Sequence, residues 1–477
     1  MTDARDPAHR RRRPDLAAYL DRQRWFGGKG RNFSVTGATT VAVLRPGGGE
    51  VAPVRLDMIH VAYDDGETET YQLPLVSYAA PVEHLAHVLV GEETDVEGTS
   101  RLLYDALHDK DCTALWVEGI AGEREVDGLS FHREPSAGEL PPGGPSIVVG
   151  AEQSNTSLIF GDSLILKVFR KVSPGLNPDI EMHSALAKAR STHIATPLGW
   201  LEGRWSDPAG ESEVTASLAM AQVFLKGATE GWELALTSVR DLYAEGDLHA
   251  DEVGGDFAGE AERLGAATAE VHAALAQALP TGHLEGKELA GLADAMRGRL
   301  ERAARDVREL QPYVAGLRAA FDDLAGLHEP VAVQRVHGDF HLGQVMRTLE
   351  GWKLLDFEGE PARPLQERRA LESPVKDVAG MLRSFDYAAR HLLADHPPGS
   401  QRAYRGVEWA ERNRDAFLTG YARESGRDPR SQPVLLRAFE TDKAIYEARY
   451  EARNRPAWLP IPMAAIHRLA SNTSEQE

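Results

Sequence analysis

Three polar residues in the second half of the chain have the types and the spacing that phosphoryl transfer requires. Asp339 is followed five residues later by Gln344 and 17 residues later by Asp356, which ends an apolar run. In kinases one carboxylate orients the proton of the acceptor hydroxyl, while an amide oxygen and a second carboxylate hold Mg²⁺ against the nucleotide phosphates. We therefore predict that Asp339 is catalytic and that Gln344 and Asp356 bind the metal.

Single Asp residues in loops are usually turn or capping groups, and one alone would be read that way. Here two acids, an amide and two histidines, His337 and His341, fall within one short segment, which favours function. A zinc site lacks a third ligand at a useful spacing. We expect these histidines to fix the backbone by hydrogen bonding, and we take His341 as a candidate contact of the acceptor.

Upstream residues have the order that a nucleotide site requires. Lys167 lies in the apolar run LILKVF, and Glu181 follows 14 residues later in a predicted helix. This matches the strand lysine and helix glutamate of kinases, in which the lysine neutralises phosphate charge. The alternative for each residue is an exposed side chain with no such role.

Two further segments are candidates for nucleotide contact. The loop at 150–157 lacks the G-x-G-x-x-G pattern, but its backbone N–H groups and the side chains of Ser154, Asn155 and Thr156 are suited to covering phosphates. The run MAQVFL (220–225) stands where a hinge would pair with adenine, so Gln222 and Phe224 are assigned there, with a plain buried strand as the alternative. The chain contains no Walker A sequence.

The elements that must position these residues change in character along the chain. Asp64-Asp65-Gly66 between two alternating runs predicts a β-hairpin, and a Pro- and Gly-rich stretch at 134–145 predicts a loop. Three β-like runs and a helix that contains Glu181 come next, and helices dominate after about residue 228. The β-like runs are 146–150, 157–160 and 163–169, and the clearest helical segments are 261–279 and 288–310.

These patterns predict an α+β fold with two lobes and an added N-terminal part. We expect a cap subdomain at 1–85, a small sheet-containing subdomain at 86–225 and a helical lobe at 226–477. Only the terminal residues, about 1–13 and 470–477, are expected to be unstructured, with the basic run at 10–13 as a solvated tail.

Composition limits the classes of function. The 477 residues include 53 Lys and Arg against 73 Asp and Glu, a net charge of −20 that repels nucleic acid and anionic membranes. Cys112 is the only cysteine, which excludes an intrachain disulfide and a multi-cysteine metal centre. No apolar stretch is long enough to span a bilayer, so we expect a cytoplasmic protein.

The catalytic segment HGDFHLGQ (337–344) and the strand end LLDFE (354–358) resemble the aminoglycoside phosphotransferase-like branch of the protein kinase-like fold. Four other segments make the resemblance to the bacterial maltokinase family more specific, over about residues 20–467. They are RWFGGKGR (24–31), DFEGEPARP (356–364), SPVKDVAGMLRSFDYAA (373–389) and YEARNRPAWLPIP (450–462).

This resemblance implies ATP and Mg²⁺ as cofactors and phosphorylation of maltose at its anomeric hydroxyl, giving maltose 1-phosphate for α-glucan (glycogen) synthesis. It also implies a cap over the small lobe and a sugar site in the helical lobe. Our candidates for that site are Lys443, Tyr446, Glu447 and Tyr450, which pair at i, i+4 spacing on one predicted helix. An ion-paired amphipathic helix is the alternative.

Three other readings stay open at this point. Related actinobacterial kinases act on glucosamine, and others of the fold act on aminoglycosides, so the acceptor is less fixed than the reaction. An inactive kinase fold acting as a scaffold for trehalose synthase is a further alternative, which the joint presence of Lys167, Asp339, Gln344 and Asp356 disfavours. Trehalose synthase is also a candidate partner of an active enzyme, and we expect a monomer or weak oligomer.

Overall fold

The computed structural model describes residues 14–49, 51–94, 98–141, 144–149, 155–206, 213–360, 363–393 and 399–471. The chain divides into two compact units, and a short segment crosses from one to the other. Unit 1 contains the residues up to 184 together with 195–226, and unit 2 contains 185–194 and the residues from 227 onward. The predicted boundary at 225/226 lies one residue from the final division between the units.

Unit 1 begins with α1 (Leu16–Arg22) and an antiparallel sheet. The sheet has the order β1-β2-β3-β5-β4, with β11 paired to β3. Its strands are β1 (Phe33–Arg45), β2 (Val54–Tyr63), β3 (Thr68–Tyr78), β4 (Leu89–Thr94), β5 (Ser100–Asp105) and β11 (Lys171–Val172). The predicted hairpin is confirmed, because β2 and β3 pair across a turn in which Gly66 has a φ of +88°. The cap boundary predicted at residue 85 is wrong, because β4 and β5 complete the same sheet.

A second sheet of seven strands completes unit 1, with the order β6-β7-β12-β13-β10-β9-β8. The helix α2 (Lys110–Ala121) accompanies it, and α3 (Pro178–Lys188) begins in unit 1 and ends in the segment that belongs to unit 2. The strands of this sheet are β6 (Glu125–Val126), β7 (Leu129–Arg133), β8 (Ser146–Val149), β9 (Asn155–Phe160), β10 (Leu164–Phe169), β12 (Pro197–Ser206) and β13 (Glu213–Val223). The three predicted β-like runs are therefore confirmed as β8, β9 and β10.

The alternation of buried and half-buried side chains along β10 explains how the strand positions Lys167. Leu164, Leu166 and Val168 are each fully buried in one apolar core that also contains residues of the first sheet, such as Leu56. Successive side chains of a strand point to opposite faces, so Lys167 lies on the other face of the sheet. The strand thus buries its apolar face and keeps the lysine half-buried.

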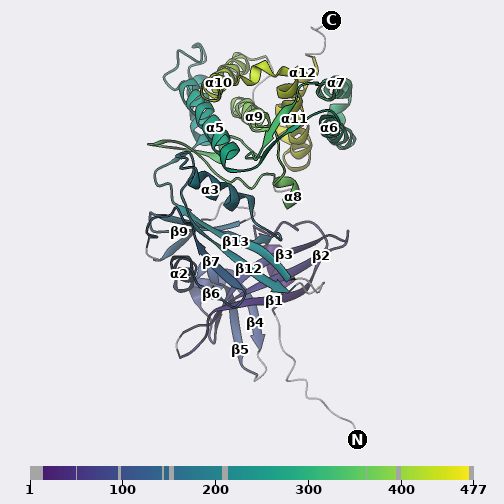
Figure 1. The fold of residues 1–477 in the computed structure, drawn as a ribbon. Coiled ribbons are helices and arrows are strands. Elements are labelled where there is room, and N and C mark those ends of the chain that lie inside the picture. The colour runs from purple at the N-terminus through teal and green to yellow at the C-terminus, as the bar shows by residue number, and fades with distance from the viewer. Residues whose placement is uncertain are drawn as a thin grey trace. The chain divides into compact units, whose positions relative to one another are not determined.

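Unit 2 is mainly helical, and Figure 1 shows α9 in its middle, with α10, α11 and α12 around it. Its helices are α4 (Gly231–Ala244), α5 (Ala258–Ala278), α6 (Lys287–Asp306), α7 (Val314–Ala325), α8 (Leu365–Arg368), α9 (Val375–His391), α10 (Gln401–Ser425), α11 (Pro433–Asn454) and α12 (Pro460–Ser471). The predicted helices at 261–279 and 288–310 are confirmed as α5 and α6. The second ends early, because a 3₁₀ segment with Pro312 inside it follows.

Short strands and 3₁₀ turns connect these helices. One small sheet has the order β14-β17-β18, and β15 pairs with β16. The strands are β14 (Thr229–Glu230), β15 (Thr281–Leu284), β16 (Val331–Gln334), β17 (Val345–Thr348) and β18 (Gly351–Leu354). Among the described residues of both units, the 3₁₀ turns are η2 (Glu83–Val88), η3 (Ala106–His108), η4 (Arg308–Tyr313), η5 (Leu342–Gln344), η6 (Pro429–Ser431) and η7 (Pro456–Trp458).

The prediction that both chain ends are unstructured can be compared with the structure only at residues 470 and 471. Residues 1–13 and 472–477 lie outside the described part of the chain, whereas 470 and 471 belong to α12. In the part of the chain that the structure describes, no helix is both long and apolar enough to cross a membrane.

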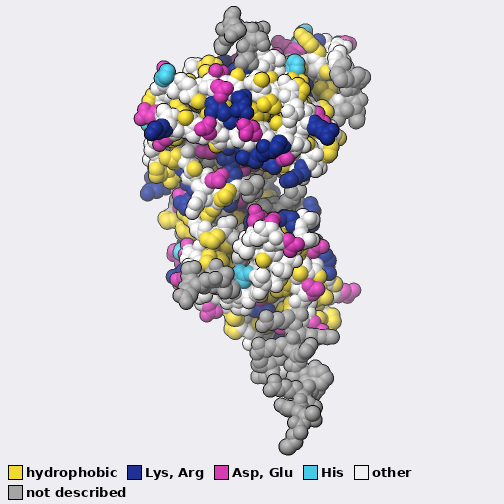
Figure 2. Space-filling model, turned by 90° about the vertical axis from the view of Figure 1, so that its right-hand side faces the viewer, with side chains coloured by type: hydrophobic (Ala, Val, Ile, Leu, Met, Phe, Trp, Pro, Cys, Tyr) yellow, Lys and Arg dark blue, Asp and Glu magenta, His cyan; other side chains and the backbone are white. Residues whose placement is uncertain are grey.

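The surface of unit 2 carries mixed charge. Figure 2 shows Lys and Arg side chains next to Asp and Glu side chains on the face turned to the viewer. Exposed ion pairs between α6 and α7, such as Arg318 with Glu301 at 2.7 Å, are of this kind. Such pairs contribute about 0–1 kcal/mol each, so the apolar core stabilises the unit far more than they do.

Candidate active site

The loop that carries Asp339 connects β16 to η5 and is held by α9. The backbone N–H groups of His337 and Gly338 donate to the two carboxylate oxygens of Asp377, at 2.7 and 2.9 Å. Further along, the Leu342 N–H donates to the Ser384 hydroxyl at 3.0 Å. The loop conformation therefore depends on side chains of α9, which lie about 40 residues away in the sequence.

Two glycines let the loop and the helix approach each other. Gly338 has a φ of +84°, a conformation that other residues adopt only with strain. On α9, a Cβ atom at Gly380 would lie 2.6 Å from the carbonyl oxygen of Phe340, the residue after Asp339. Because that contact is with backbone, any larger residue at 380 would displace the catalytic loop.

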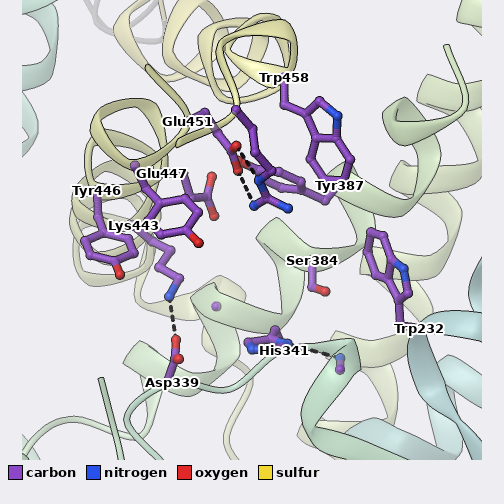
Figure 3. A pocket seen from close by; sticks show the side chains of 14 residues that line it. Trp232, Asp339, His341, Ser384, Tyr387, Lys443, Tyr446, Glu447, Glu451 and Trp458 are labelled. Atoms are coloured by element: carbon purple, nitrogen blue, oxygen red, sulfur yellow. Dashed lines mark hydrogen bonds and ion pairs between the residues drawn. The ribbon is translucent and has the colours of Figure 1, made fainter. Parts of the chain in front are cut away.

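Asp339 forms an ion pair with Lys443 of α11. The distance from Lys443 Nζ to Asp339 Oδ1 is 2.8 Å, and Figure 3 shows the two side chains pointing at each other. Burial raises the pKa of Asp339, but the charges of Lys443 and His341 outweigh burial and hold that pKa well below its usual range. Burial lowers the pKa of Lys443, and Asp339 more than offsets this, so the lysine pKa is raised. Asp339 is thus a carboxylate at neutral pH.

The two loop histidines do different things. His337 is buried, its Nε2 donates to the Leu355 carbonyl at 2.8 Å, and its ring packs near Phe340 and Phe357. In His341, Nδ1 accepts from the Gly343 N–H at 3.0 Å. Burial lowers the pKa of His341 to about 4, although Asp339 opposes the shift, so its imidazole is neutral at pH 7. The prediction that both histidines fix the backbone is confirmed.

Gln344 and Asp356 meet next to this loop. The side-chain amide Nε2 of Gln344 lies 3.3 Å from Asp356 Oδ2. Asp356 follows β18 and has a φ of +61°, in the left-handed region that costs a non-glycine residue about 1–2 kcal/mol. Strain of this kind accumulates at functional sites, where it aims a side chain that a relaxed backbone would turn away.

The oxygen donors at this place fit a magnesium ion. An oxygen of Glu358 lies within 4.8 Å of one of Asp356, and the Gln344 amide can present its oxygen after rotation by half a turn. Mg²⁺ prefers carboxylate and amide oxygens, usually with retained water. Glu358 was not among the predicted ligands, and its position two residues after Asp356 is the signal that could have identified it.

A cavity of about 640 Å³ in unit 2 begins at Asp339 and extends along α11 (Figure 3). Its volume is typical of pockets for small molecules. Asp339, His341 and all four residues predicted for the sugar line it together. The complete lining is Trp232, Asp339, His341, Gly343, Gly380, Ser384, Tyr387, Lys443, Tyr446, Glu447, Tyr450, Glu451, Arg455 and Trp458.

The carboxylates of the cavity are each paired with a cation. Glu447 accepts from Arg383 of α9 at 3.0 and 2.7 Å, and Glu451 accepts from Arg455 at 2.9 and 2.7 Å. Burial raises the pKa of Glu447 by more than Arg383 lowers it. Lys443 and Glu447 are therefore not each other's partners, as the ion-paired-helix alternative would have them, because each bonds to a residue outside α11.

Aromatic rings form the rest of the wall. The rings of Tyr446 and Tyr450 are nearly parallel, with centroids 6.4 Å apart, and these residues are 37% and 43% exposed. The Arg455 guanidinium lies 4.2 Å from the ring centre of Trp458. Exposed ring faces beside hydrogen-bonding groups are suited to a sugar, whose C–H face stacks and whose hydroxyls bond.

The predicted nucleotide residues of unit 1 have mixed outcomes. Lys167 Nζ lies 3.4 Å from Asp179 at the start of α3, and Glu181 follows two residues later on that helix, half-buried. Asp179 is thus an acidic partner that sequence reasoning missed. The assignment of Thr156 to phosphates is wrong, because it is 5% exposed and its hydroxyl accepts from Arg170 at 2.8 Å.

The other candidates in unit 1 stay predictions. Ser154 lies outside the described residues, and Asn155 is the half-buried first residue of β9. Gln222 belongs to β13, and within the described residues its buried Nε2 has no hydrogen-bond partner. Phe224 follows the strand, and its N–H donates to the Ser163 carbonyl. A buried amide N–H₂ group without a partner is suited to a polar ligand.

Two family models match the chain. The model for the maltokinase N-terminal cap domain matches residues 19–109, and the model for the phosphotransferase enzyme family matches residues 149–430. The first match covers the six-stranded sheet except β11, together with most of α1. The second covers the catalytic loop, the Gln344 and Asp356 pair and Lys167.

Similar proteins are named glucosamine kinases. One from Streptacidiphilus jiangxiensis is 29% identical over 362 residues, covering 72% of this chain and 78% of that protein. One from Mycolicibacterium smegmatis (strain ATCC 700084 / mc(2)155) is 28% identical over 385 residues, covering 78% of this chain and 87% of that protein.

Among solved structures, a glucosamine kinase in complex with glucosamine, ADP and inorganic phosphate has the same fold. Its TM-score is 0.67 at 23% identity, over 96% of this chain and 99% of that chain. This supports the predicted α+β fold with a sheet-containing N-terminal part and a helical C-terminal part. The chain therefore belongs to the phosphotransferase enzyme family, with a maltokinase-type cap at its N-terminal end.

Proposed function

We propose that this protein transfers the γ-phosphoryl group of ATP to a hydroxyl group of a sugar. The observation that carries the proposal is the position of Asp339, an ionised carboxylate at one end of a cavity walled by tyrosines, tryptophans and hydrogen-bonding groups. A phosphotransferase needs an acceptor hydroxyl held beside such a carboxylate, and a sugar suits the remaining walls.

In this mechanism the main task of the active-site residues is to orient the acceptor hydroxyl and the phosphates, and proton transfer contributes less. Asp339 accepts a hydrogen bond from the acceptor hydroxyl and aims its oxygen at the phosphorus, and a loose transition state requires little basicity for this. Gln344, Asp356 and Glu358 would hold Mg²⁺, which supplies neutralisation of the charge on the phosphates. Lys167 of unit 1 stays the residue that the sequence assigns to the charge of a bound nucleotide.

The cavity charge narrows the class of acceptor. Three carboxylates line the cavity, and the ion pairs given above join each of them to one cation. These pairs leave no excess of positive charge among the described lining residues, so a neutral or cationic sugar suits the wall better than a sugar that already carries a phosphate. The relatives named glucosamine kinase favour the cationic one, so glucosamine is our first candidate.

Maltose is the second candidate, and it was the acceptor that the sequence predicted. The cap model and the resemblance of the 450–462 segment to maltokinase support it, and a cavity of about 640 Å³ accommodates a disaccharide. Its product would be maltose 1-phosphate, used for α-glucan synthesis, with trehalose synthase as a candidate partner. The expected cytoplasmic location stays a prediction.

An acceptor panel tests the proposal. The full chain would be incubated with ATP and Mg²⁺ and with glucosamine, maltose, glucose, trehalose or an aminoglycoside, and ADP release would be measured. Turnover that depends on one sugar supports the proposal and names the acceptor. ATP binding without turnover of any acceptor would contradict it and favour the scaffold alternative.

A further inference from the structure

A largely buried cluster of charges connects α10 and α12 to the cavity of about 640 Å³. The six side chains come from four helices, and they are Arg383, Asp386, Arg414, Glu440, Glu447 and Arg468. Three are cations and three are carboxylates, so their formal charges cancel. Among these six described residues, only Glu447 lines the cavity, where Figure 3 labels it. The cluster therefore meets the proposed acceptor site at one side chain.

Arg383 lies between two carboxylates of this cluster. Its side chain is fully buried, and its Nη1 donates to Asp386 Oδ2 at 2.5 Å. Its Nε and Nη2 both donate to Oε2 of Glu447, at 3.0 and 2.7 Å. Arginine and a carboxylate often form two parallel hydrogen bonds, one to each oxygen. Here a single oxygen of Glu447 takes both bonds.

The other carboxylate oxygen of Glu447, Oε1, is left for a ligand. Among the described residues, no donor lies within hydrogen-bond distance of it. Glu447 is 9% exposed and lines the cavity, so a group bound in the cavity can reach this oxygen. A mostly buried acceptor without a partner costs free energy, and a hydroxyl or ammonium group of a sugar would satisfy it.

Asp386 determines where the Arg383 guanidinium lies. Arg468 Nη2 and Arg414 Nη1 also approach its Oδ2, at 3.2 and 3.6 Å. Burial raises the pKa of Asp386, but the charges of the three arginines outweigh burial and lower that pKa, so Asp386 is a carboxylate at neutral pH. Because Asp386 holds Nη1, Arg383 does not turn to give each oxygen of Glu447 its own hydrogen bond.

Glu440 holds the two outer arginines of the cluster. Its Oε1 accepts from Arg414 Nη2 at 2.5 Å, and its Oε2 lies 3.7 Å from Arg468 Nη1. Glu440 is 3% exposed, whereas the Arg468 side chain is 42% exposed. Arg468 is therefore the member of the cluster that can be replaced with the least risk to folding.

We propose that Asp386, supported by Arg414 and Arg468, is a positioning residue for the acceptor site. It holds Arg383 against one oxygen of Glu447 and so reserves the other, Oε1, for the acceptor sugar. The effect on sugar binding rests on the proposed function. The coupling between Asp386 and Glu447 does not rest on it, so the two can fail separately.

Steady-state kinetics with glucosamine and with maltose test the effect on the acceptor. In Asp386→Ala the Arg383 guanidinium is free to take both oxygens of Glu447. We expect KM for the acceptor to rise about 10- to 100-fold, the effect of one lost hydrogen bond to a charged group, while KM for ATP stays within about twofold. Asp386→Asn keeps an oxygen that accepts from Arg383 and should recover most of the affinity.

Two results of this comparison would overturn the proposal. One is an unchanged KM for the acceptor in Asp386→Ala, after thermal melting has shown that the protein is folded. The other is an equal rise in KM for the acceptor and for ATP, which would show that Asp386 is merely structural.

Arg468→Gln and Arg437→Gln form a matched pair of variants. Both arginines join α12 to the rest of unit 2, but Arg437 does so through the Leu469 carbonyl and pairs with Asp323. We expect acceptor KM to rise about two- to fivefold in Arg468→Gln and to stay unchanged in Arg437→Gln. Equal effects would overturn the proposal, because the cluster would then only hold α12 in place. Because Arg468 is exposed, this pair decides the question even if Asp386→Ala does not fold.

A double-mutant cycle in denaturant tests the coupling without any sugar. Asp386→Ala and Glu447→Gln each remove one partner of Arg383, which then pairs more fully with the other. The loss of stability in the double variant should therefore exceed the sum of the two single losses. Additive losses would overturn the proposal. A non-additive cycle in a protein that phosphorylates no sugar would keep the coupling through Arg383 and reject the proposed function.

Discussion

Removal of the positive charge on Lys443 is the sharpest test of the electrostatics at the site. The change is Lys443→Met, which keeps the unbranched apolar stem of the side chain and removes its charged end. Two unit charges 2.8 Å apart in a medium of effective dielectric constant about 20 attract by about 6 kcal/mol, equivalent to about four pKa units. The Asp339 and Lys443 side chains are 23% and 20% exposed, and water therefore weakens their attraction. We expect the loss of Lys443 to raise the pKa of Asp339 by about two to three units.

The sign of the effect follows from which form is active. The carboxylate is the form that accepts from the acceptor hydroxyl, and Lys443 keeps its pKa below the usual range. Without Lys443, burial is the main remaining influence and raises the pKa above that of a free aspartate, about 3.9. Activity should then be lost on acidification at a higher pH than in the wild type.

The assay is the pH dependence of kcat/KM between about pH 4 and pH 8 for the wild type, Lys443→Met and Lys443→Arg. We expect no acidic limb due to Asp339 in the wild type, an acidic limb at the low end of this range in Lys443→Met, and its absence in Lys443→Arg. A loss that is equal at every pH would show only a lost acceptor contact, and it would refute the assignment of Lys443 to the ionisation of Asp339.

Three further predictions concern α9 and the metal ligands. In Gly380→Ala the added methyl group would lie 2.6 Å from the Phe340 carbonyl oxygen. We therefore expect kcat to fall at least about tenfold and the free energy of unfolding to fall by about 1–3 kcal/mol. Kinetics like those of the wild type would show that the loop tolerates displacement. Arg383→Met leaves the Glu447 carboxylate buried without its cation and should lower the free energy of unfolding by about 3–5 kcal/mol in denaturant titration. The double variant Arg383→Met with Glu447→Gln should lose less than Arg383→Met alone. Equal losses in the single and the double variant would argue against coupling between these two residues. Asp356→Asn should raise the Mg²⁺ concentration that gives half-maximal turnover by about tenfold or more, and an unchanged Mg²⁺ dependence would remove Asp356 from the ligand set.

The sequence predicted best what is local along the chain. Asp339, Gln344 and Asp356 lie within 18 residues, and the structure places them in one loop and the strand end after it. The hairpin around Gly66 and the helices α5 and α6 were equally local, since turn residues and helical spacing are visible in a short window.

Contacts between distant segments could not be predicted in the same way. Lys443 was assigned to the sugar from its place on a helix, but its ion pair joins it to a residue 104 positions earlier. Asp377 and Arg383 were missed because a charged residue in a helix is usually exposed, whereas these two are almost fully buried at the centre of unit 2. Thr156 was misassigned because β9 begins one residue before it and turns its hydroxyl toward Arg170.

The central claim is that Asp339 serves an acceptor hydroxyl of a sugar in ATP-dependent phosphorylation. The most direct measurement compares ADP release by the wild type and by Asp339→Asn with glucosamine and with maltose, after thermal melting has shown that both proteins are folded. We predict sugar-dependent turnover in the wild type and a loss of about 100- to 10,000-fold in kcat for the variant, with ATP binding retained. Turnover of the same sugar at a near-normal rate by Asp339→Asn would contradict this account of the site.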